Sequence, residues 1–278
     1  MASDLPWRWD CPQPLDFFEA LVAEDQGLGL LEAAASLAQD DYPDLDLQGV
    51  VDEVDALGRR LRDRVPADAS GLHRIRLLHR FFFGELGFAG NVNHYHDPDN
   101  SYLHRVLQTR RGIPISLAVL YLELAAAAGL QAQGVSFPGH FLVKVRLTSG
   151  EVVVDPFTGE SLSRRALEER LEALRGTPDD DAPPLGLYLV AASPREVLAR
   201  MLRNLKAIHA ERADTARQLA VQERLVRLLP EDWQERCERG LLRAEAGAVA
   251  PALEDLRRCL SERPDDPQAP RLRRLADE

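Results

Sequence analysis

Long apolar runs, lysine and cysteine are all scarce in this chain of 278 residues, and each scarcity excludes a class of protein. No stretch approaches the roughly 18 consecutive apolar residues of a membrane span, so no membrane contact is expected. Only two basic residues are lysines, Lys144 and Lys206, and the formal charge of −11 argues against nucleic-acid binding, because phosphates require clustered positive charge. The three cysteines, Cys11, Cys237 and Cys259, are too few and too scattered to predict a disulfide framework or a cysteine-based zinc site.

Negative charge is concentrated at the beginning of the chain. Residues 1–64 contain 15 acidic residues and 5 arginines, a net charge of −10, so the other residues together carry about −1. We expect this acidic segment to form a solvated helical face, and the alternative is a docking surface for a basic partner. The first residues, Met1 to Asp4, lack a basic stretch followed by an apolar run, so no secretory signal is predicted and a cytoplasmic protein is expected.

Helical periodicity dominates the first third of the sequence. An apolar stripe with helical spacing predicts an amphipathic helix there, formed by Val50, Val54, Leu57 and Leu61. Ser70 is expected to cap a second helix that runs from Leu72 to about Phe83. That helix is predicted to turn four apolar side chains inward, those of Leu72, Ile75, Leu78 and Phe82.

A polar segment from Gly90 to Tyr102 is dense in turn-forming residues, and long polar loops often carry function. Asn100 or Ser101 is expected to cap the short helix that follows. Four side chains of the segment are predicted to bind a ligand: Asn91, Tyr95, Asn100 and Ser101. A metal site is the alternative for its His94, His96 and Asp97. Ties to the local backbone are favoured instead, and no metal or other cofactor is predicted.

A helix and a β-hairpin are predicted next. Residues 115–128 are apolar on almost every side, which is typical of a buried helix, with Pro114 in its first turn and Gly129 at its end. Alternating residues then predict strands from Phe141 to Leu147 and from Glu151 to Asp155. We therefore expect an α+β core in which the helix packs on a small antiparallel sheet.

Helices return after the hairpin, first from about residue 164 to 175. Ser193, Pro194 and Glu196 form a strong helix start. Pro230 and Pro264 are 34 residues apart, the period of tetratricopeptide repeats, although the repeat pattern around them is degenerate. The sequence thus divides into an acidic helical region (1–66), an α+β core (67–176), a polar, proline-rich linker (177–192) and an all-α repeat tail (193–278).

The core resembles the transglutaminase-like superfamily, whose members are related to papain-type thiol enzymes. Gly112-Ile-Pro-Ile-Ser-Leu-Ala118 resembles the start of that superfamily's buried helix. Pro138-Gly-His140-Phe resembles its histidine strand, and Val154-Asp155-Pro-Phe157 the end of its aspartate strand. The resemblance implies a site in which a helix N-terminus favours a thiolate, imidazole accepts the proton and the carboxylate fixes the imidazole tautomer.

The nucleophile implied by this resemblance is missing. Two residues after Gly112, where the superfamily has its cysteine, stands Pro114, and no cysteine lies between residues 12 and 236. Ser116 is the only nearby hydroxyl, and serine needs stronger activation than cysteine. The candidate catalytic residues are therefore Ser116, His140 and Asp155, each with a purely structural role as the alternative. His140 and Asp155 oppose each other only if the hairpin loop has about four residues or a bulge.

A more specific resemblance is to a bacterial family of the SirB type, in which a transglutaminase-like core precedes tetratricopeptide repeats. It covers roughly Leu30 to the C-terminus and rests on four stretches: Asn91–Leu107, Arg110–Leu117, Phe137–Val143 and Arg200–His209. The resemblance implies that proline in place of the cysteine is a feature of the whole family. It also implies the fold of that family and an interaction role, without implying a particular reaction.

Three functions remain open at this point. The favoured one is a non-catalytic scaffolding or regulatory protein, a pseudoenzyme that binds a protein or peptide through its C-terminal repeats. The alternative is a hydrolase or acyl transferase that uses Ser116, His140 and Asp155. A transcriptional regulator acting on DNA is suggested only by the family's name, and the net charge argues against it. The oligomeric state is left open.

Overall fold

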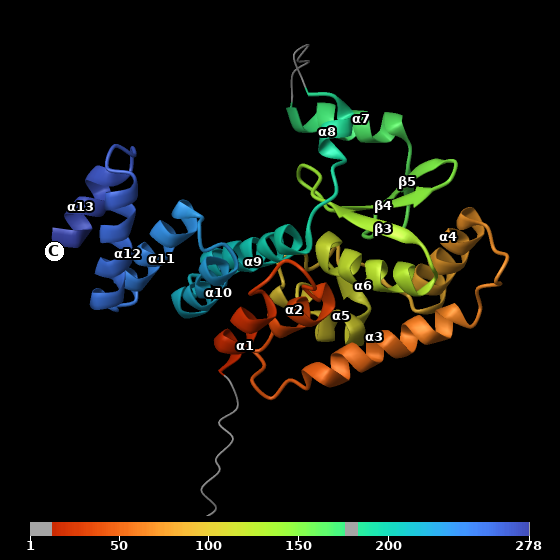
Figure 1. Ribbon diagram of the computed structural model, residues 1–278, viewed down its shortest axis with the longest axis horizontal. Coiled ribbons are helices and arrows are strands. Elements are labelled where there is room, and N and C mark those ends of the chain that lie inside the picture. The colour runs from red at the N-terminus through yellow and green to blue at the C-terminus, as the bar shows by residue number, and fades with distance from the viewer. Residues whose placement is uncertain (1–12, 176–182, 278) are drawn as a thin grey trace, which may run out of the picture.

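The central element of the computed structural model, which describes residues 13–175 and 183–277, is helix α6 (Pro114–Ala127). It begins with Pro114 and gives way to Gly129, whose φ of 71° is a left-handed conformation that suits glycine, so the sequence prediction is confirmed. Its side chains are buried on nearly every side. A helix that is apolar on every side must have other elements packed around it, and Figure 1 shows it between the sheet and α3 (Leu47–Arg62).

The sheet has the strand order β3-β4-β5-β6, with every neighbouring pair antiparallel. Its strands are β3 (Gln131–Val135), β4 (Leu142–Leu147), β5 (Gly150–Val154) and β6 (Ser161–Leu162). One face, with Val143 and Val145, belongs to the hydrophobic cluster around α6. The other face packs against α7 (Arg164–Arg175) and α8 (Leu185–Tyr188). The predicted α+β architecture is therefore confirmed.

The N-terminal helices are α1 (Pro14–Leu21), α2 (Leu30–Ser36), α3, α4 (Gly71–His79) and a π-helical turn, η1 (Arg80–Glu85). The predicted stripe on α3 is buried, and Ser70 caps α4 by accepting a hydrogen bond from the His73 amide at 3.3 Å. The inward position predicted for Leu72 is wrong, because its side chain is 49% exposed. Leu72 lies in the first turn of α4, at the rim of a surface cavity that it lines with Leu147.

The predicted polar loop is closed at its base by two short parallel strands, β1 (Ala89–Gly90) and β2 (Arg111–Gly112). Between them lie a 3₁₀ turn, η2 (Pro98–Asn100), and helix α5 (Leu103–Thr109). Neither Asn100 nor Ser101 caps α5, so that prediction is wrong, and Tyr102 occupies the N-cap position without a side-chain bond. The Asn100 amide is engaged instead by carbonyl groups of the loop itself.

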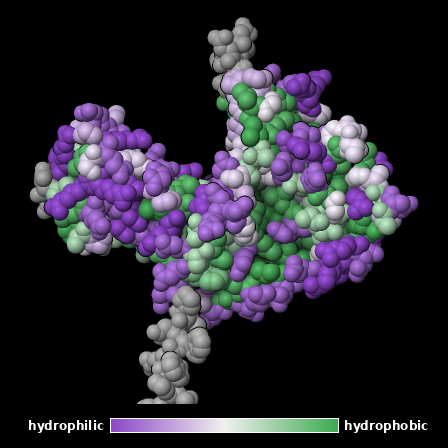
Figure 2. All heavy atoms as spheres, viewed as in Figure 1, coloured by the Kyte–Doolittle hydropathy of each residue, from purple (hydrophilic) through white to green (hydrophobic). Residues whose placement is uncertain are grey.

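The C-terminal half contains α9 (Pro194–Glu211), α10 (Thr215–Leu228), α11 (Trp233–Glu245), α12 (Val249–Glu262) and α13 (Ala269–Asp277). The predicted capping box of Ser193 and Glu196 starts α9, as expected. Figure 1 shows these helices extending away from the sheet, and on the face drawn in Figure 2 their far end is mostly hydrophilic. Within the described ranges, no helix is long and apolar enough to cross a bilayer.

Two hydrophobic clusters divide the chain at a place that the sequence did not indicate. One cluster runs from Phe18 to Leu228 and therefore joins the N-terminal helices, α6, α9 and α10. A second, around Trp233 and Leu256, belongs to α11–α13. Part of the predicted linker lies outside the described residues, and the part beyond it packs on the core: Ala191 forms a β-bridge with Val135. That part is not a free linker, because its apolar residues cover the sheet.

The acidic segment is not only a solvated face, which corrects the expectation from its charge. Four of its acids form ion pairs with arginines of α9 and α10: Asp25–Arg195, Asp40–Arg224, Asp41–Arg217 and Glu19–Arg227. Arg224 is almost completely buried and holds both oxygens of Asp40, at 2.8 and 2.9 Å. The acids therefore bind the beginning of the chain to its helical tail.

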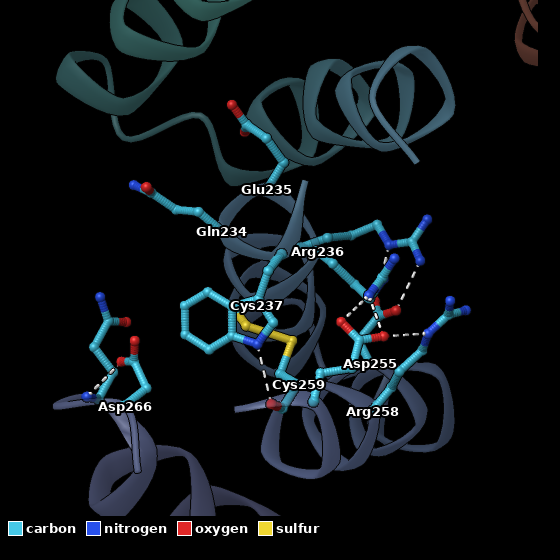
Figure 3. Close-up of a disulfide and its surroundings, with 12 residues drawn as sticks. Gln234, Glu235, Arg236, Cys237, Asp255, Arg258, Cys259 and Asp266 are labelled. Atoms are coloured by element: carbon cyan, nitrogen blue, oxygen red, sulfur yellow. Dashed lines mark hydrogen bonds and ion pairs between the residues drawn. A yellow bond between two sulfur atoms is a disulfide. The ribbon is translucent and has the colours of Figure 1, made fainter. Parts of the chain in front are cut away.

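Two of the scattered cysteines meet in the last cluster. Cys237 of α11 and Cys259 of α12 form a disulfide, with their Cα atoms 6.0 Å apart (Figure 3). Both side chains are buried, and the Trp233 indole donates a hydrogen bond to the Cys259 carbonyl at 3.0 Å. The low cysteine count did not predict this bridge, because helices that fold back on each other bring together residues 22 positions apart in sequence.

Candidate functional site

The candidate histidine is positioned by a tight turn at the start of β4. Gly139 has a φ of 65°, and the His140 amide donates a hydrogen bond to the Phe137 carbonyl at 3.0 Å. Proline followed by a glycine with positive φ is the pattern of a type II turn. Pro138 and Gly139 therefore fix where the imidazole leaves the backbone.

The candidate aspartate follows directly after β5 and is almost completely buried. His140 Nε2 lies 2.9 Å from Asp155 Oδ1, which also accepts a hydrogen bond from the Phe157 amide at 2.9 Å. The Arg170 guanidinium donates to Asp155 Oδ2 at 3.0 Å. Burial alone would raise the pKa of Asp155, but these hydrogen bonds and charges outweigh it and hold the pKa below its usual value. An ionised carboxylate thus orients the imidazole through Nε2.

His140 and Asp155 come together although the hairpin loop consists only of Thr148 and Ser149. In the β4–β5 register, Val143 pairs with Val154, so His140 lies two residues beyond the position opposite Asp155. The condition for direct opposition, a loop of about four residues or a bulge, is therefore not met, and the two residues are not paired across the strands. The imidazole is long enough to reach back across this offset from the turn.

Ser116 does not share this environment. Its side chain is fully buried in the first turn of α6, and its Oγ donates to the Asn100 carbonyl at 2.5 Å. The same Oγ accepts a hydrogen bond from the Ile113 amide at 3.2 Å. Over the described ranges, no hydrogen bond joins Ser116 to His140, so the three candidate residues do not form a connected triad.

The four candidate binding residues have different surroundings. Asn91 donates its side-chain amide to Asn100 Oδ1 at 2.9 Å, and Asn100 donates to the His94 carbonyl at 2.6 Å. Ser101 is fully buried, and its Oγ has no partner in the parts of the chain that are described. Tyr95 alone is exposed, at 42%. Asn91 and Asn100 therefore hold the loop together, and Tyr95 faces solvent.

Phe157 connects this loop to the histidine. Its ring centroid lies 6.0 Å from that of Tyr95 and 6.2 Å from that of His140. The Gly90 amide donates to the Phe157 carbonyl at 2.9 Å, and a Cβ added at Gly90 would lie 2.4 Å from the phenyl ring. Sequence reasoning quoted Phe157 only within a motif and missed the role of Gly90, because no local pattern indicates a contact with a distant strand.

The alternative of a metal site finds no support in the surroundings of its residues. His96 Nδ1 lies 3.3 Å from Glu211 Oε2, and Asp97 accepts a hydrogen bond from the Asp99 amide at 3.1 Å. Among the residues placed by the structure, no group of three or more His, Cys, Asp or Glu side chains is arranged to hold a metal ion.

In chemical terms, the site has an oriented imidazole with a buried carboxylate behind it. In the described chain, Nδ1 of His140 has no hydrogen-bond partner and is the nitrogen that could take up a proton. No cysteine lies in the core, and Ser116 is bound to backbone groups. The described core thus holds an imidazole–carboxylate pair to which no thiol or hydroxyl of the described residues is hydrogen-bonded.

Comparisons with known proteins agree with this geometry. Residues 48–203 match the transglutaminase-like superfamily, and residues 205–277 match the tetratricopeptide repeat. A UPF0162 protein of Xylella fastidiosa is 38% identical over 244 residues, which cover 86% of this chain and 85% of that protein. A UPF0162 protein of Pseudomonas aeruginosa is 33% identical and covers 72% of each chain. Protein SirB1 of Salmonella typhimurium is 29% identical, covering 86% of this chain and 87% of its own.

No solved structure matches the chain. The superfamily match spans more than half of the sequence, and the relative from Xylella fastidiosa is similar over 86% of it. The chain therefore belongs to the bacterial UPF0162/SirB1 family, with a transglutaminase-like core followed by tetratricopeptide repeats.

Proposed function

We propose that the chain is a non-catalytic binding protein with a scaffolding or regulatory role, in which the repeats engage a protein partner and the core has no nucleophile. One observation carries the first part of this proposal. At the opening of α6 stands Pro114, and the nearest hydroxyl, on Ser116, is fully buried and donates to the Asn100 carbonyl.

The hydrogen bonds of Ser116 argue against its use as a nucleophile. An attacking serine needs a base within hydrogen-bond reach and an approach path for the substrate carbonyl. Here the hydroxyl proton is directed at a backbone carbonyl 2.5 Å away, and the side chain has no exposed surface. Freeing it would break a buried hydrogen bond that helps to join η2 to α6. A role for Ser116 in holding the loop is the simpler account.

The repeats support the second part of the proposal. Tetratricopeptide repeats generally mediate protein–protein interactions, and the repeat match covers residues 205–277. In this chain, α11–α13 have a hydrophobic cluster of their own. A surface that does not depend on the histidine site is thus available for a partner.

The first test asks whether the purified full-length chain has Ser116-dependent chemistry. A fluorophosphonate probe and a panel of ester, thioester and amide substrates are expected to show neither labelling nor turnover. Ser116→Ala and His140→Ala are the diagnostic variants, and Ser101→Ala is the control because Ser101 is equally buried nearby. Labelling or turnover that disappears in Ser116→Ala and His140→Ala, but persists in Ser101→Ala, would establish the hydrolase or acyl transferase and overturn the proposal.

A second test locates the partner surface. The full chain, carrying a photoreactive cross-linker, is expressed in bacterial cells, and cross-linked peptides are identified by mass spectrometry. Cross-links that map to residues 205–277, unchanged in His140→Ala, are expected. Partners that cross-link only to residues 13–175 would refute a role of the repeats in binding.

A further inference from the structure

Arg200 on α9 is a partly buried guanidinium without a carboxylate. Its Nη1 donates to Ser136 Oγ at 2.6 Å and to the Phe137 carbonyl at 3.2 Å, and the group lies 5.7 Å from the centroid of the Phe141 ring. Within residues 13–175 and 183–277, no acidic side chain forms an ion pair with it. Nearby arginines differ: Arg195 and Arg203 each hold an acid. A desolvated cation without a counter-charge is unfavourable unless something else supplies the charge.

The acidic residue at the best spacing to pair with Arg200, Glu196, forms its hydrogen bonds with Ser193 instead. Glu196 precedes Arg200 by four residues, the spacing at which a helix normally pairs opposite charges. Its Oε2 instead accepts hydrogen bonds from the backbone amide of Ser193 at 2.7 Å and from the Ser193 hydroxyl at 2.9 Å. The capping box that starts α9 therefore leaves Arg200 without a partner.

The edge of the guanidinium that has no partner among the described residues has the geometry that binds a carboxylate. Nη1 uses its two N–H groups on Ser136 and Phe137, which leaves Nε and Nη2 without an acceptor among the described residues. These atoms form the edge that binds a carboxylate with two parallel hydrogen bonds. Burial lowers the pKa of Arg200, with the Tyr95 hydroxyl acting in the opposite direction, which agrees with a charge removed from water.

A cavity of about 510 Å³ adjoins Arg200, of a size typical for small-ligand sites. Its wall is mainly aliphatic, with contributions from Leu187, Val190, Ala191 and Ala199. Leu187 and Val190 are 64% and 62% exposed, which is high for aliphatic side chains. In Figure 1 the chain descends from α8 to the start of α9 at this place. The cavity thus combines an apolar wall with an unpaired cation.

We propose that this cavity, called the Arg200 pocket, binds the C-terminal carboxylate of a polypeptide whose last residue is aliphatic. The Nε and Nη2 edge of Arg200 would receive the carboxylate, and the aliphatic wall would receive the last side chain. This inference rests on the proposed function in one respect, namely that the ligand is bound and released unchanged. It names the ligand class of the interaction protein without using the repeats.

The test uses the peptide acetyl-Ala-Ala-Leu as free acid and as C-terminal amide, titrated into the full-length protein and followed by NMR. We expect the acid to bind about 10- to 100-fold more tightly than the amide, the range of a charge-assisted bidentate contact. Arg200→Met should remove that preference. Arg200→Lys should keep only part of it, because the lysine ammonium cannot donate two parallel hydrogen bonds to a carboxylate as the planar guanidinium does. Glu196→Gln keeps the capping box, because glutamine can accept the same hydrogen bonds. It should tighten binding of the acid, because it removes from the pocket wall a negative charge that repels the peptide carboxylate.

Arg203→Met is the matched control. Arg203 also lines the pocket and lies on the same helix, but its charge is taken up by Glu235, which retains Lys206 at 2.8 Å when Arg203 is removed. The control should keep the preference for the acid. Circular dichroism and the melting temperature establish that each variant is folded.

Three results would overturn the inference: equal binding of acid and amide by the wild type, an unchanged preference in folded Arg200→Met, or tighter binding of octanoate than of the peptide acid. The last result would assign the pocket to a fatty acid. Mass spectrometry of the recovered peptide separates the two proposals. A cleaved or transferred peptide would refute the non-catalytic function while leaving the carboxylate site in place.

Discussion

Replacing Asp40 with alanine should strongly destabilise the protein, although Asp40 lies far from the candidate site in sequence. The carboxylate accepts hydrogen bonds from Nε and Nη2 of Arg224, whose side chain is only 1% exposed. The Asp40 side chain is 30% exposed, but its removal leaves the charge of Arg224 buried without its partner, a change that typically costs 3–5 kcal/mol in a fully buried pair. Arg224 would keep the Pro14 carbonyl at 3.2 Å and the Phe18 ring at 5.3 Å. We therefore expect a loss of about 3 kcal/mol, the lower end of that range.

The assay is urea unfolding at pH 7, followed by far-ultraviolet circular dichroism. The control is Glu19→Gln, which breaks the Glu19–Arg227 pair between α1 and α10, where the side chains are 47% and 40% exposed. Exposed pairs contribute about 0–1 kcal/mol, so the control should change little. In the double variant Asp40→Ala/Arg224→Met, part of the loss should be recovered, because no charge remains buried. Equal effects of Asp40→Ala and Glu19→Gln would refute the reasoning.

Three further predictions concern other parts of the molecule. Cys237→Ser/Cys259→Ser should lower the stability of the α11–α13 cluster by about 3 kcal/mol, the value expected for a loop of this length, and calorimetry with and without reductant measures it. An unchanged transition would contradict a stabilising bridge. Gly90→Ala should destabilise by about 1–3 kcal/mol because its Cβ would collide with Phe157, whereas the control Gly84→Ala has open space and should lack that penalty in the same urea assay. Burial lowers the pKa of three histidines in the folded protein, His79, His104 and His209. Below about pH 6.5 the unfolded state therefore binds more protons than the folded state, and the free energy of unfolding should fall on acidification from pH 7 to pH 5. The loss at each histidine should be about 1.4 kcal/mol for every unit by which its folded pKa lies below the unfolded value. A flat urea midpoint over that interval would contradict the third prediction.

Features fixed by neighbouring residues could be predicted from the sequence. The capping box at Ser193, the apolar stripe on α3 and the end of α6 near Gly129 all depend on contacts within a few positions. The β-hairpin was predicted for the same reason, since alternation and a short polar loop are local signals. These elements also define the overall α+β architecture.

The side-chain network of the site could be predicted only in part. The resemblance identified His140 and Asp155, and the structure brings them together at 2.9 Å. It did not identify Arg170 on α7, because a helical arginine in a charged segment carries no sign of the carboxylate that it reaches. Asn100 was misread as a cap for a related reason: its amide has several possible acceptors, and the fold of the loop decides among them.

Long-range ion pairs were the least predictable feature. The sequence shows acids near the start and arginines near the end, but not which of them meet. Asp40 and Asp41 belong to the acidic segment for which a solvated face is expected, and in the structure they form ion pairs with Arg224 and Arg217. Composition predicts that such charges are solvated, whereas the folded chain places one of the arginines almost entirely out of water.

The course of α9 limits how this family can be divided or recombined. The superfamily match ends at residue 203 and the repeat match begins at residue 205, so the boundary falls inside the single helix Pro194–Glu211. A truncation there would cut a helix whose apolar face completes the main core. The boundary between the two hydrophobic clusters lies after Leu229: the main cluster ends there, and the cluster of α11–α13 begins at Trp233. An exchange of the last helices between relatives should therefore replace α11–α13, leave α9 and α10 with the core, and keep the ion pairs of Glu235 with Arg203 and Lys206.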